Sequence, residues 1–359
     1  MNDSFIRSLA TVTRPIMRTE PPDVVVASIV LNWNRRELTL ACLASLEAMS
    51  VPAGVEHRIV VVDNGSTDGS AEAVRAAFPH VVLVALPENL GFAAGANVGI
   101  RRALDEGAAW TLLVNNDTVA APSLLTELYA GAAVAELAAA PLPGRAPRRG
   151  PIGLVAPTVT YFDPPGAVWP SAGFRRPWTL DAHDTTADPP SPHPYDIDWA
   201  NGCCILVRRA LWERIGLFDE RFRVYYEDHD LCLRARAAGF RLAHVPSARI
   251  AHHVAASTGV GSPGQAYLLA RSSVPYYAAH SRGAHRAVVV AYRIVSLGLT
   301  LARSLLGGRP ATGAAYVRGL AAGCRDVGSR QASAWPTAIG SADVADPSGT
   351  MEGMGDDER

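Results

Sequence analysis

The chain has 359 residues, of which 48% are hydrophobic and 19% are charged, and its formal net charge is −1. This length allows one large α/β domain with additions, or two smaller domains. The nearly balanced charge gives no support to a nucleic-acid-binding function. Five cysteines occur without a C-x-x-C spacing, and Cys203 and Cys204 are adjacent. The cysteine pattern therefore favours reduced, buried thiols over disulfides or a zinc site, as expected of a cytoplasmic protein.

The N-terminal third alternates between short apolar runs and helical patterns. Residues 1–22 are polar and have no long apolar core, which predicts a flexible leader and not a signal peptide. Buried strands are predicted over 24–32, 57–63, 81–87 and 110–115. Helices are predicted over 35–50, 69–78 and 95–107. This alternation is typical of a mainly parallel sheet covered on both faces, with ligands bound beyond the carboxyl ends of its strands.

Three polar loops follow these strands. In VVVDNGSTDGS (60–70), Asp63 either contacts a nucleotide or belongs to a turn that caps the next helix. The glycines of ENLGFAAGANVGI (88–100) allow the backbone to approach a diphosphate beside a helix N-terminus, although no G-x-G-x-x-G or P-loop is present. In LLVNNDT (112–118), Asp117 suits a divalent cation, and helix capping is the alternative.

The middle of the chain combines irregular segments with an acidic run. Residues 139–152 and 162–195 are rich in Pro, Gly and Arg, which predicts loops, and 197–216 predicts a strand followed by a helix. The run YYEDHDLCLRAR (225–236) then places three carboxylates at a predicted helix start. Acids are common there because they complement the helix dipole, so the run alone leaves open which of them does chemistry. Asp230 faces Arg234 as an ordinary (i, i+4) pair, unless the arginine neutralises a leaving group.

The C-terminal part is predicted to be helical over 286–328 and disordered over 329–359. Within it, AVVVAYRIVSLGLTLARSLLGG (287–308) is apolar but is interrupted by Arg293 and Arg303. Three interpretations stay open: contact with a membrane surface, packing on the main domain, and membrane spanning. The two charges favour the first two, because a charge at the centre of a spanning helix costs roughly 2.5–3.5 kcal/mol.

Seven segments of the chain resemble family-2 glycosyltransferases, and most closely the bacterial rhamnosyltransferase-like branch that builds cell-surface polysaccharide. In order they are SIVLNWNR (28–35), VVDNGSTDGS (61–70), NLGFAAGANVGI (89–100), LLVNNDT (112–118), WANGCCILVRR (199–209), GLFDERFRVYYEDHDLCLRARAAGF (216–240) and HHVAASTG (252–259). The resemblance implies a GT-A fold, an α/β fold with a Rossmann-like, mainly parallel central sheet flanked by helices and a C-terminal helical extension. It implies a GT-A domain over 23–285, with a nucleotide-sugar half (23–120) and an acceptor and catalytic half (151–285).

The resemblance also implies roles for individual residues. Those implied to bind the nucleotide-sugar are Asn32, Asp63, Asn89, Gly91, Asn97 and Asn116. Those implied to bind the acceptor are Trp199, Asn201 and Gly202. Asp228 is implied as the catalytic base, with Glu227 beside it. Asp117 and His252 are implied as metal ligands, with His253 as the alternative to His252, whereas Asn115 stands where the family has the first Asp of its Asp-x-Asp motif.

The resemblance implies an inverting glycosyltransferase that depends on Mg²⁺ or Mn²⁺. It would move a sugar, with rhamnose the favoured one, from a nucleotide-diphosphate donor to a glycan or lipid-linked acceptor, in the cytoplasm or at the inner face of the cell membrane. Two alternatives stay open. A nucleotidyltransferase would usually carry a Gly-rich basic loop where NWNRREL (32–38) stands, and a glycan-binding protein with an inactive site would not need Asp117, Asp228 and His252.

Overall fold

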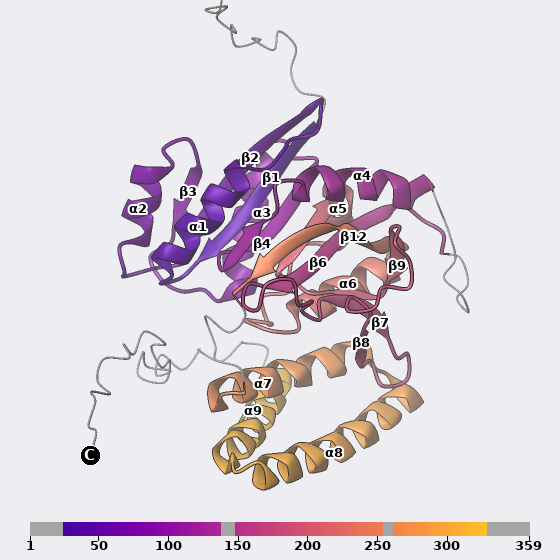
Figure 1. The fold of residues 1–359 in the computed structure, drawn as a ribbon. Coiled ribbons are helices and arrows are strands. Elements are labelled where there is room, and N and C mark those ends of the chain that lie inside the picture. Colours follow the sequence, from indigo (N-terminus) through magenta and orange to yellow (C-terminus); the bar gives the residue numbers. More distant parts are fainter. Residues whose placement is uncertain (1–23, 138–147, 254–260, 329–359) are drawn as a thin grey trace, which may run out of the picture.

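The computed structural model describes residues 24–137, 148–253 and 261–328 (Figure 1). The predicted leader and tail, and part of the loop expected over 139–152, lie outside these ranges.

A nine-stranded sheet forms the centre of the described structure, in the order β3-β2-β1-β4-β11-β6-β12-β5, with β9 paired to β12. Its first half consists of the parallel strands β1 (Val24–Asn32), β2 (Val55–Asp63), β3 (Val82–Ala85) and β4 (Trp110–Asn115). Its second half consists of β5 (Thr118–Ala120), β6 (Ile152–Tyr161), β9 (Tyr195–Ile197), β11 (Cys204–Arg208) and β12 (Arg241–His252). Strands β6 and β12 point the same way as β1, whereas β5, β9 and β11 run against it. The predicted mainly parallel sheet is confirmed.

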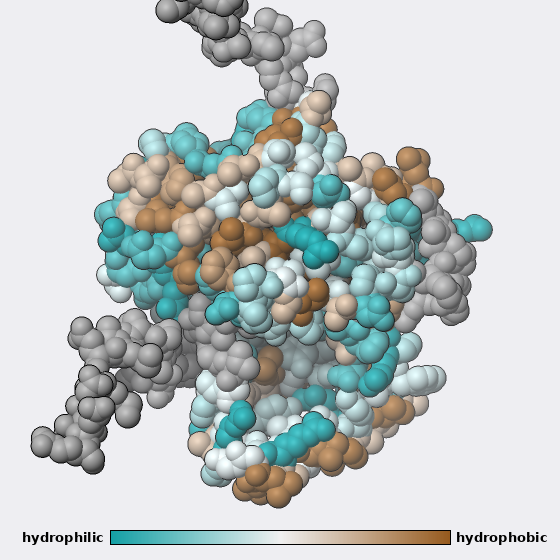
Figure 2. Space-filling model, viewed as in Figure 1, coloured by the Kyte–Doolittle hydropathy of each residue, from teal (hydrophilic) through white to brown (hydrophobic). Residues whose placement is uncertain are grey.

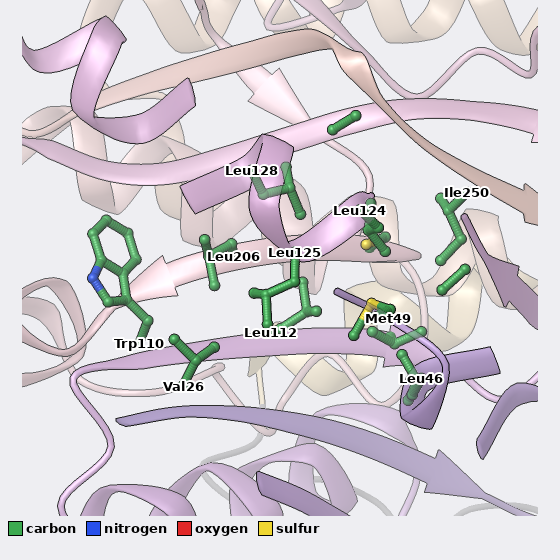
Figure 3. Packing of buried hydrophobic residues seen from close by; sticks show 14 of the residues in the cluster. Val26, Leu46, Met49, Trp110, Leu112, Leu124, Leu125, Leu128, Leu206 and Ile250 are labelled. Carbon is green, nitrogen blue, oxygen red and sulfur yellow. The ribbon is translucent and has the colours of Figure 1, made fainter. Parts of the chain in front are cut away.

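Two buried apolar clusters lie on opposite faces of this sheet. Successive strand residues alternate between them, as the period of two requires: Leu112 belongs to one cluster and Leu113 to the other. The first cluster packs α1 (Arg36–Glu47) and α4 (Leu124–Leu137) on the sheet; Figure 3 shows Leu125 and Leu128 of α4 above Leu112. The second packs α3 (Phe92–Asp105), α5 (Arg209–Ile215) and α6 (Glu227–Ala237). One more helix, α2 (Ser70–Ala77), connects β2 to β3.

The expected loop over 162–195 is wrong in part. It contains β7 (Ala172–Arg175) and β8 (Ala182–Asp184), which form a small antiparallel sheet with β10 (Trp199–Ala200). Strands of two to four residues are too short to show an alternating pattern, so the Pro and Gly content decided the prediction. The helix predicted to begin at residue 95 begins at Phe92, directly after Gly91, whose φ is 87°.

Three C-terminal helices form a helical module beside the sheet domain: α7 (Pro263–His280), α8 (Gly283–Leu306) and α9 (Pro310–Gly328) (Figure 1). Helix α7 begins where the Ser262 side chain accepts a hydrogen bond from the backbone N–H of Gln265. Helix α9 approaches α7 closely because it carries glycine at the contact. A Cβ atom on Gly319 would lie only 2.3 Å from the carbonyl oxygen of Tyr267.

Two glycine-to-alanine exchanges distinguish the effect of the α7–α9 contact on stability from the effect of helix propensity. Gly298→Ala in α8 should raise the melting temperature, because a Cβ there meets nothing within 4 Å and alanine gains about 1 kcal/mol in a helix. Gly319→Ala should lower it, because the same gain is outweighed by the clash with Tyr267. Thermal unfolding of both variants beside the parent checks this. Equal stabilisation by both would contradict the packing described.

Candidate functional site

The side chain of Asn32, at the end of β1, is the centre of a buried polar network. Its Nδ2 donates to Asp63 Oδ1 at 2.8 Å and to Ser66 Oγ at 3.1 Å. Its Oδ1 accepts from Thr39 Oγ1 at 2.7 Å and from Asn116 Nδ2 at 3.0 Å. The network therefore joins the carboxyl ends of β1, β2 and β4 to α1, because the parallel strands end at the same edge of the sheet. Sequence reasoning did not include Thr39.

The loop after β3 is attached to the end of β2 by Asn64. The Asn64 side chain donates to Asn89 Oδ1 at 3.0 Å and to the Gly91 carbonyl at 3.1 Å, and it accepts from the Leu90 N–H at 2.9 Å. Asn89 Oδ1 also accepts from the Gly91 N–H at 2.8 Å. The sequence indicated Asn64 only as a turn residue, although it lies inside the VVDNGSTDGS segment.

Gly91 has a backbone conformation that favours glycine, and a Cβ on it would lie 2.9 Å from the carbonyl oxygen of Arg223. The Phe92 N–H donates to that same carbonyl at 2.6 Å. The start of α3 is thus fixed by a segment from the second half of the chain.

Asn97 is turned away from this loop. Its side chain donates to the Phe218 carbonyl at 2.9 Å and to Glu220 Oε1 at 3.0 Å, and it accepts from the Phe218 N–H at 3.0 Å. Asn97 is buried, and these contacts connect α3 to the segment before the acidic run. The structure does not bring Asn97 together with Asp63 and Asn89.

Asp117 and His252 lie side by side. Strands β5 and β12 pair Thr118 with His252, which places Asp117 Oδ1 3.1 Å from His252 Nε2. The ring of His253 instead stacks on Phe162, with centroids 3.7 Å apart. Between the two adjacent histidines, the geometry favours His252 as the partner of Asp117.

The donor atoms of this pair fit a divalent cation. Asp117 Oδ1 and His252 Nδ1 are buried and make no well-directed hydrogen bond within the part of the chain that the structure describes, although Asp117 Oδ1 faces His252 Nε2 at 3.1 Å. The described ranges contain no cluster of three or more His, Cys, Asp or Glu side chains that could hold a metal. A cation at this pair would therefore need phosphate or water oxygens to complete its shell, as is usual for Mg²⁺. Burial lowers the pKa of His252, but the neighbouring Cys203 and Asp117 raise it by more, to about 10. A cation bound at this pair would therefore have to displace the imidazole proton, because only the neutral ring ligates a metal.

Asp228 lies at the start of α6 and faces the turn before β11. Its Oδ2 accepts from the Gly202 N–H at 3.0 Å, and its Oδ1 accepts from the His229 N–H at 2.6 Å. The carboxylate is buried, and these two bonds fix both of its oxygens while leaving them lone pairs for a further donor. Gly202, predicted on the acceptor side, and Asp228 are thus brought together. Asn201 Oδ1 accepts from the Cys203 N–H at 2.9 Å and shapes the same turn.

Glu227 and Asp228 have different environments although they are adjacent. Burial raises the pKa of Glu227 well above its ordinary value, and the neighbouring Asp228 raises it further. The Oε2 atom of Glu227 has no hydrogen-bond partner within the described ranges, so no donor stabilises a negative charge on that atom. The environment of Glu227 therefore favours the neutral acid, whereas the Asp228 carboxyl accepts two backbone hydrogen bonds.

Asp230 connects three helices or loops. Arg234 Nε donates to Asp230 Oδ2 at 2.6 Å, which is the (i, i+4) pair that the sequence favoured. His280 of α7 also contacts Asp230 Oδ1, at 2.8 Å, and Arg234 donates further to the carbonyls of Ile215 and Leu217. Asp230 thus has a structural role that attaches α7 to α6.

Trp199 is buried against His229, the residue that follows Asp228. Their rings stack with centroids 5.3 Å apart, and His229 Nδ1 lies 2.9 Å from Arg175 Nη2. Burial lowers the pKa of His229 to about 4, so the ring is neutral and its Nδ1 accepts from the guanidinium. Arg175 Nη1 also donates to the Tyr276 hydroxyl of α7 at 2.6 Å. Sequence reasoning missed Arg175, because it lies in the segment expected to be a loop.

Comparison with known proteins identifies the family. A family model described as Glycosyl transferase family 2 matches residues 28–146. The N-acetylglucosaminyl-diphospho-decaprenol L-rhamnosyltransferase of Mycobacterium tuberculosis is 32% identical over 240 residues, which cover 60% of this chain and 72% of that protein. The chain belongs to glycosyltransferase family 2. The present chain is also 42% identical to the rhamnosyltransferase WbbL of Escherichia coli over 57 residues, which cover 16% of this chain and 22% of WbbL. The predicted rhamnosyltransferase-like resemblance is confirmed.

Solved structures support the GT-A fold of the family-2 enzyme. GalNAc-T7 with UDP, GalNAc and Mn²⁺ superimposes with a TM-score of 0.52 at 13% identity, covering 70% of this chain and 48% of that one. TarS 1-349 of S. aureus in complex with UDP superimposes with a TM-score of 0.50 at 16% identity, covering 78% of this chain and 74% of that one. At these identities the likeness shows the fold alone.

The neutral state of Glu227 predicts a pH-dependent stability difference. A folded-state pKa above the unfolded value of about 4.3 means that folding takes up a proton, so this contribution weakens as the pH rises. Glu227→Gln removes that dependence, and it should raise the free energy of unfolding more at pH 8 than at pH 5.5. Urea unfolding at both pH values measures this. The exposed Glu72→Gln is the control, and a gain that is larger at pH 5.5 would contradict the prediction.

Proposed function

We propose that this family-2 glycosyltransferase is an inverting, metal-dependent enzyme that transfers rhamnose from a nucleotide-diphosphate donor to a hydroxyl group of a glycan or lipid-linked acceptor. The observation that carries the proposal is the placement of Asp228, which lies on the Gly202 turn with both oxygens oriented by backbone N–H groups. The Mycobacterium tuberculosis relative, named for rhamnosyl transfer to N-acetylglucosaminyl-diphospho-decaprenol, supports the choice of sugar and acceptor class.

In this reaction Asp228 acts as the general base. The acceptor oxygen forms a bond to the anomeric carbon as the bond from that carbon to the donor diphosphate breaks. The acceptor proton passes to the Asp228 carboxylate, and the nucleoside diphosphate leaves with the bonding electrons. A single displacement needs one base and no covalent nucleophile, and general-base catalysis contributes typically about 10²–10⁴-fold. The neutral Glu227 beside Asp228 adds no second negative charge to the acceptor side.

The acceptor is held, in this proposal, between the Gly202 turn and the Trp199 ring. Trp199 is 7% exposed, its ring stacks on His229, and its Nε1 donates to the His183 carbonyl at 3.3 Å, so an edge of this ring is the part proposed to meet the acceptor. Asn201 acts through the turn, because its Oδ1 is bonded to the Cys203 N–H. The backbone turn and this ring edge suit the hydroxyl groups and the apolar face of a sugar.

The donor side divides into contact and positioning residues. Asp63, Asn89 and Gly91 lie at the ends of β2 and in the loop after β3, where they are proposed to contact the nucleotide-sugar. Asn32 and Asn116 are proposed to position them, because both amide groups are engaged inside the network. Asn97 is proposed to position α3 through Phe218 and Glu220, in place of the donor contact that the resemblance implied.

Asp117 and His252 are proposed to hold the divalent cation. The burial of both side chains, their proximity and their carboxylate–imidazole chemistry support this assignment to Mg²⁺ or Mn²⁺. When bound, such a cation supplies positive charge that stabilises the departing diphosphate, which is commonly the largest electrostatic contribution in transfer of this kind. A lipid-linked acceptor would place the enzyme at the cytoplasmic face of the membrane.

Exchange of Asp228 for Asn should abolish turnover but leave donor binding largely intact, because the acid contacts the acceptor and not the nucleotide. The expected loss of kcat is roughly 10²–10⁴-fold. Product formation with dTDP-rhamnose and a glycan acceptor, together with donor affinity by calorimetry, measures both. Asp230→Asn is the matched control and should mainly lower the melting temperature. Equal losses of kcat in the two variants would show that the roles are wrongly divided.

The metal pair predicts a coupling between nucleotide and cation. A nucleotide-sugar with Mn²⁺ should raise the melting temperature of the parent, because ligand binding to the folded state adds RT ln(1 + [L]/Kd). For the Asp117→Asn variant with Mn²⁺, the rise in melting temperature should be only as large as the rise that the parent shows when a chelator removes the metal. The exposed Asp105→Asn is the control. An undiminished rise in Asp117→Asn would contradict the metal assignment, and a panel of donors would still report which nucleotide binds.

A further inference from the structure

The outward face of α8 is apolar along its whole length. Its exposed large side chains, which we call the outer stripe, are Val288, Val290, Ile294, Val295, Leu299, Leu305 and Leu306. Ile294 is 65% exposed and Leu306 is 90% exposed, whereas Val289 is the one large side chain of α8 buried within the described structure. Figure 2 shows apolar residues gathered along the outer edge of the helical module, where Figure 1 places α8. A helix on a soluble domain normally has the opposite arrangement, with its apolar face inward.

Two polar residues near the middle of α8, Tyr292 and Arg293, face the protein. Arg293 Nη2 donates to the Tyr316 hydroxyl of α9 at 2.7 Å, and its guanidinium lies 4.7 Å from the ring centroid of Tyr277 of α7. The Tyr292 hydroxyl donates to Asp181 at 2.8 Å. Arg293, which interrupts the apolar pattern in the sequence, therefore does not interrupt the outer stripe.

The helical segment that carries the outer stripe is basic. Residues 281–328 contain seven arginines and one acid, Asp326, which is paired with Arg271 at 2.7 Å. Arg286 and Arg303 are exposed on α8. Arg309, which directly precedes α9, and Arg318, which lies on α9, are also exposed. An apolar stripe flanked by cations complements a surface that is apolar inside and anionic at its rim, which is the arrangement of a bilayer with acidic headgroups.

We propose that α8 lies in the plane of an anionic lipid bilayer, with the outer stripe in contact with the boundary between headgroups and acyl chains. Helix α8 is long and apolar enough to cross a membrane by length and composition. Crossing would, however, remove Arg293 and Tyr292 from their partners on α7, α9 and Asp181. A second copy is a poorer occupant, because pairing two stripes would bring their flanking arginines together. The proposal goes beyond the proposed function, because it depends on neither the donor nor the acceptor.

Vesicle binding by the full chain tests this proposal. Phosphatidylcholine vesicles with about a quarter phosphatidylglycerol should co-sediment the protein, and pure phosphatidylcholine vesicles or high salt should weaken binding. Ile294→Glu with Leu299→Glu should lower the affinity at least about tenfold, because a carboxylate in the stripe opposes both apolar burial and the anionic surface. Both side chains are exposed, so the melting temperature should not change. Val134→Glu, which alters an exposed valine on α4, is the matched control and should bind as the parent does.

Equal binding to neutral and anionic vesicles, or undiminished binding by the double variant, would overturn the proposal. So would a third result: a parent that is dimeric in sedimentation velocity, a double variant that is monomeric, and no binding of either protein to vesicles. The last result would assign the stripe to a second copy. The vesicles contain no acceptor, so a failure of sugar transfer would leave this test unaffected. Transfer to a water-soluble acceptor should be the same in the parent and in the double variant.

Discussion

The buried amide of Asn32 is the interaction on which the donor side of the site depends. It donates to Asp63 and accepts from Thr39 and Asn116, so a single side chain sets the spacing of three strand ends. Asp117 follows Asn116 directly, and the candidate metal pair with His252 is therefore positioned from the same network. Loss of the amide would leave buried polar partners unsatisfied, at a cost of about 1–3 kcal/mol for each group.

The sequence allowed much of the sheet half to be predicted, because its strands are buried on both faces and read as continuous apolar runs. The strand predicted over 24–32 coincides with β1, and that over 110–115 coincides with β4. The start of α3 could not be predicted in the same way, because Phe92 is fixed by the distant carbonyl of Arg223. The short strands β7 and β8 are held by pairing with each other and with β10, which no local pattern shows.

The sequence predicts which loops form the candidate site, but not which of their side chains face a ligand. Polar residues at the ends of parallel strands must lie at one edge of the sheet, so their proximity follows from the alternation of strands and helices. Which of them face a ligand depends on tertiary hydrogen bonds: Asn97 is turned toward Phe218 and Glu220, and Asp230 toward Arg234 and His280. Likewise, helical periodicity orders the residues of α8 around its axis but does not tell which side faces α7.

The contacts of α7 connect the helical module to the sheet domain. Tyr276 and His280 touch Arg175 and Asp230, so the helical module that carries the outer stripe also supports the start of α6, where Asp228 lies. Asp228 is proposed to serve as a single base in a one-step displacement. Proton NMR of the product formed from a donor of known anomeric configuration tests it most directly. We expect inversion at the anomeric carbon of the transferred sugar, and a retained configuration would be incompatible with a single displacement.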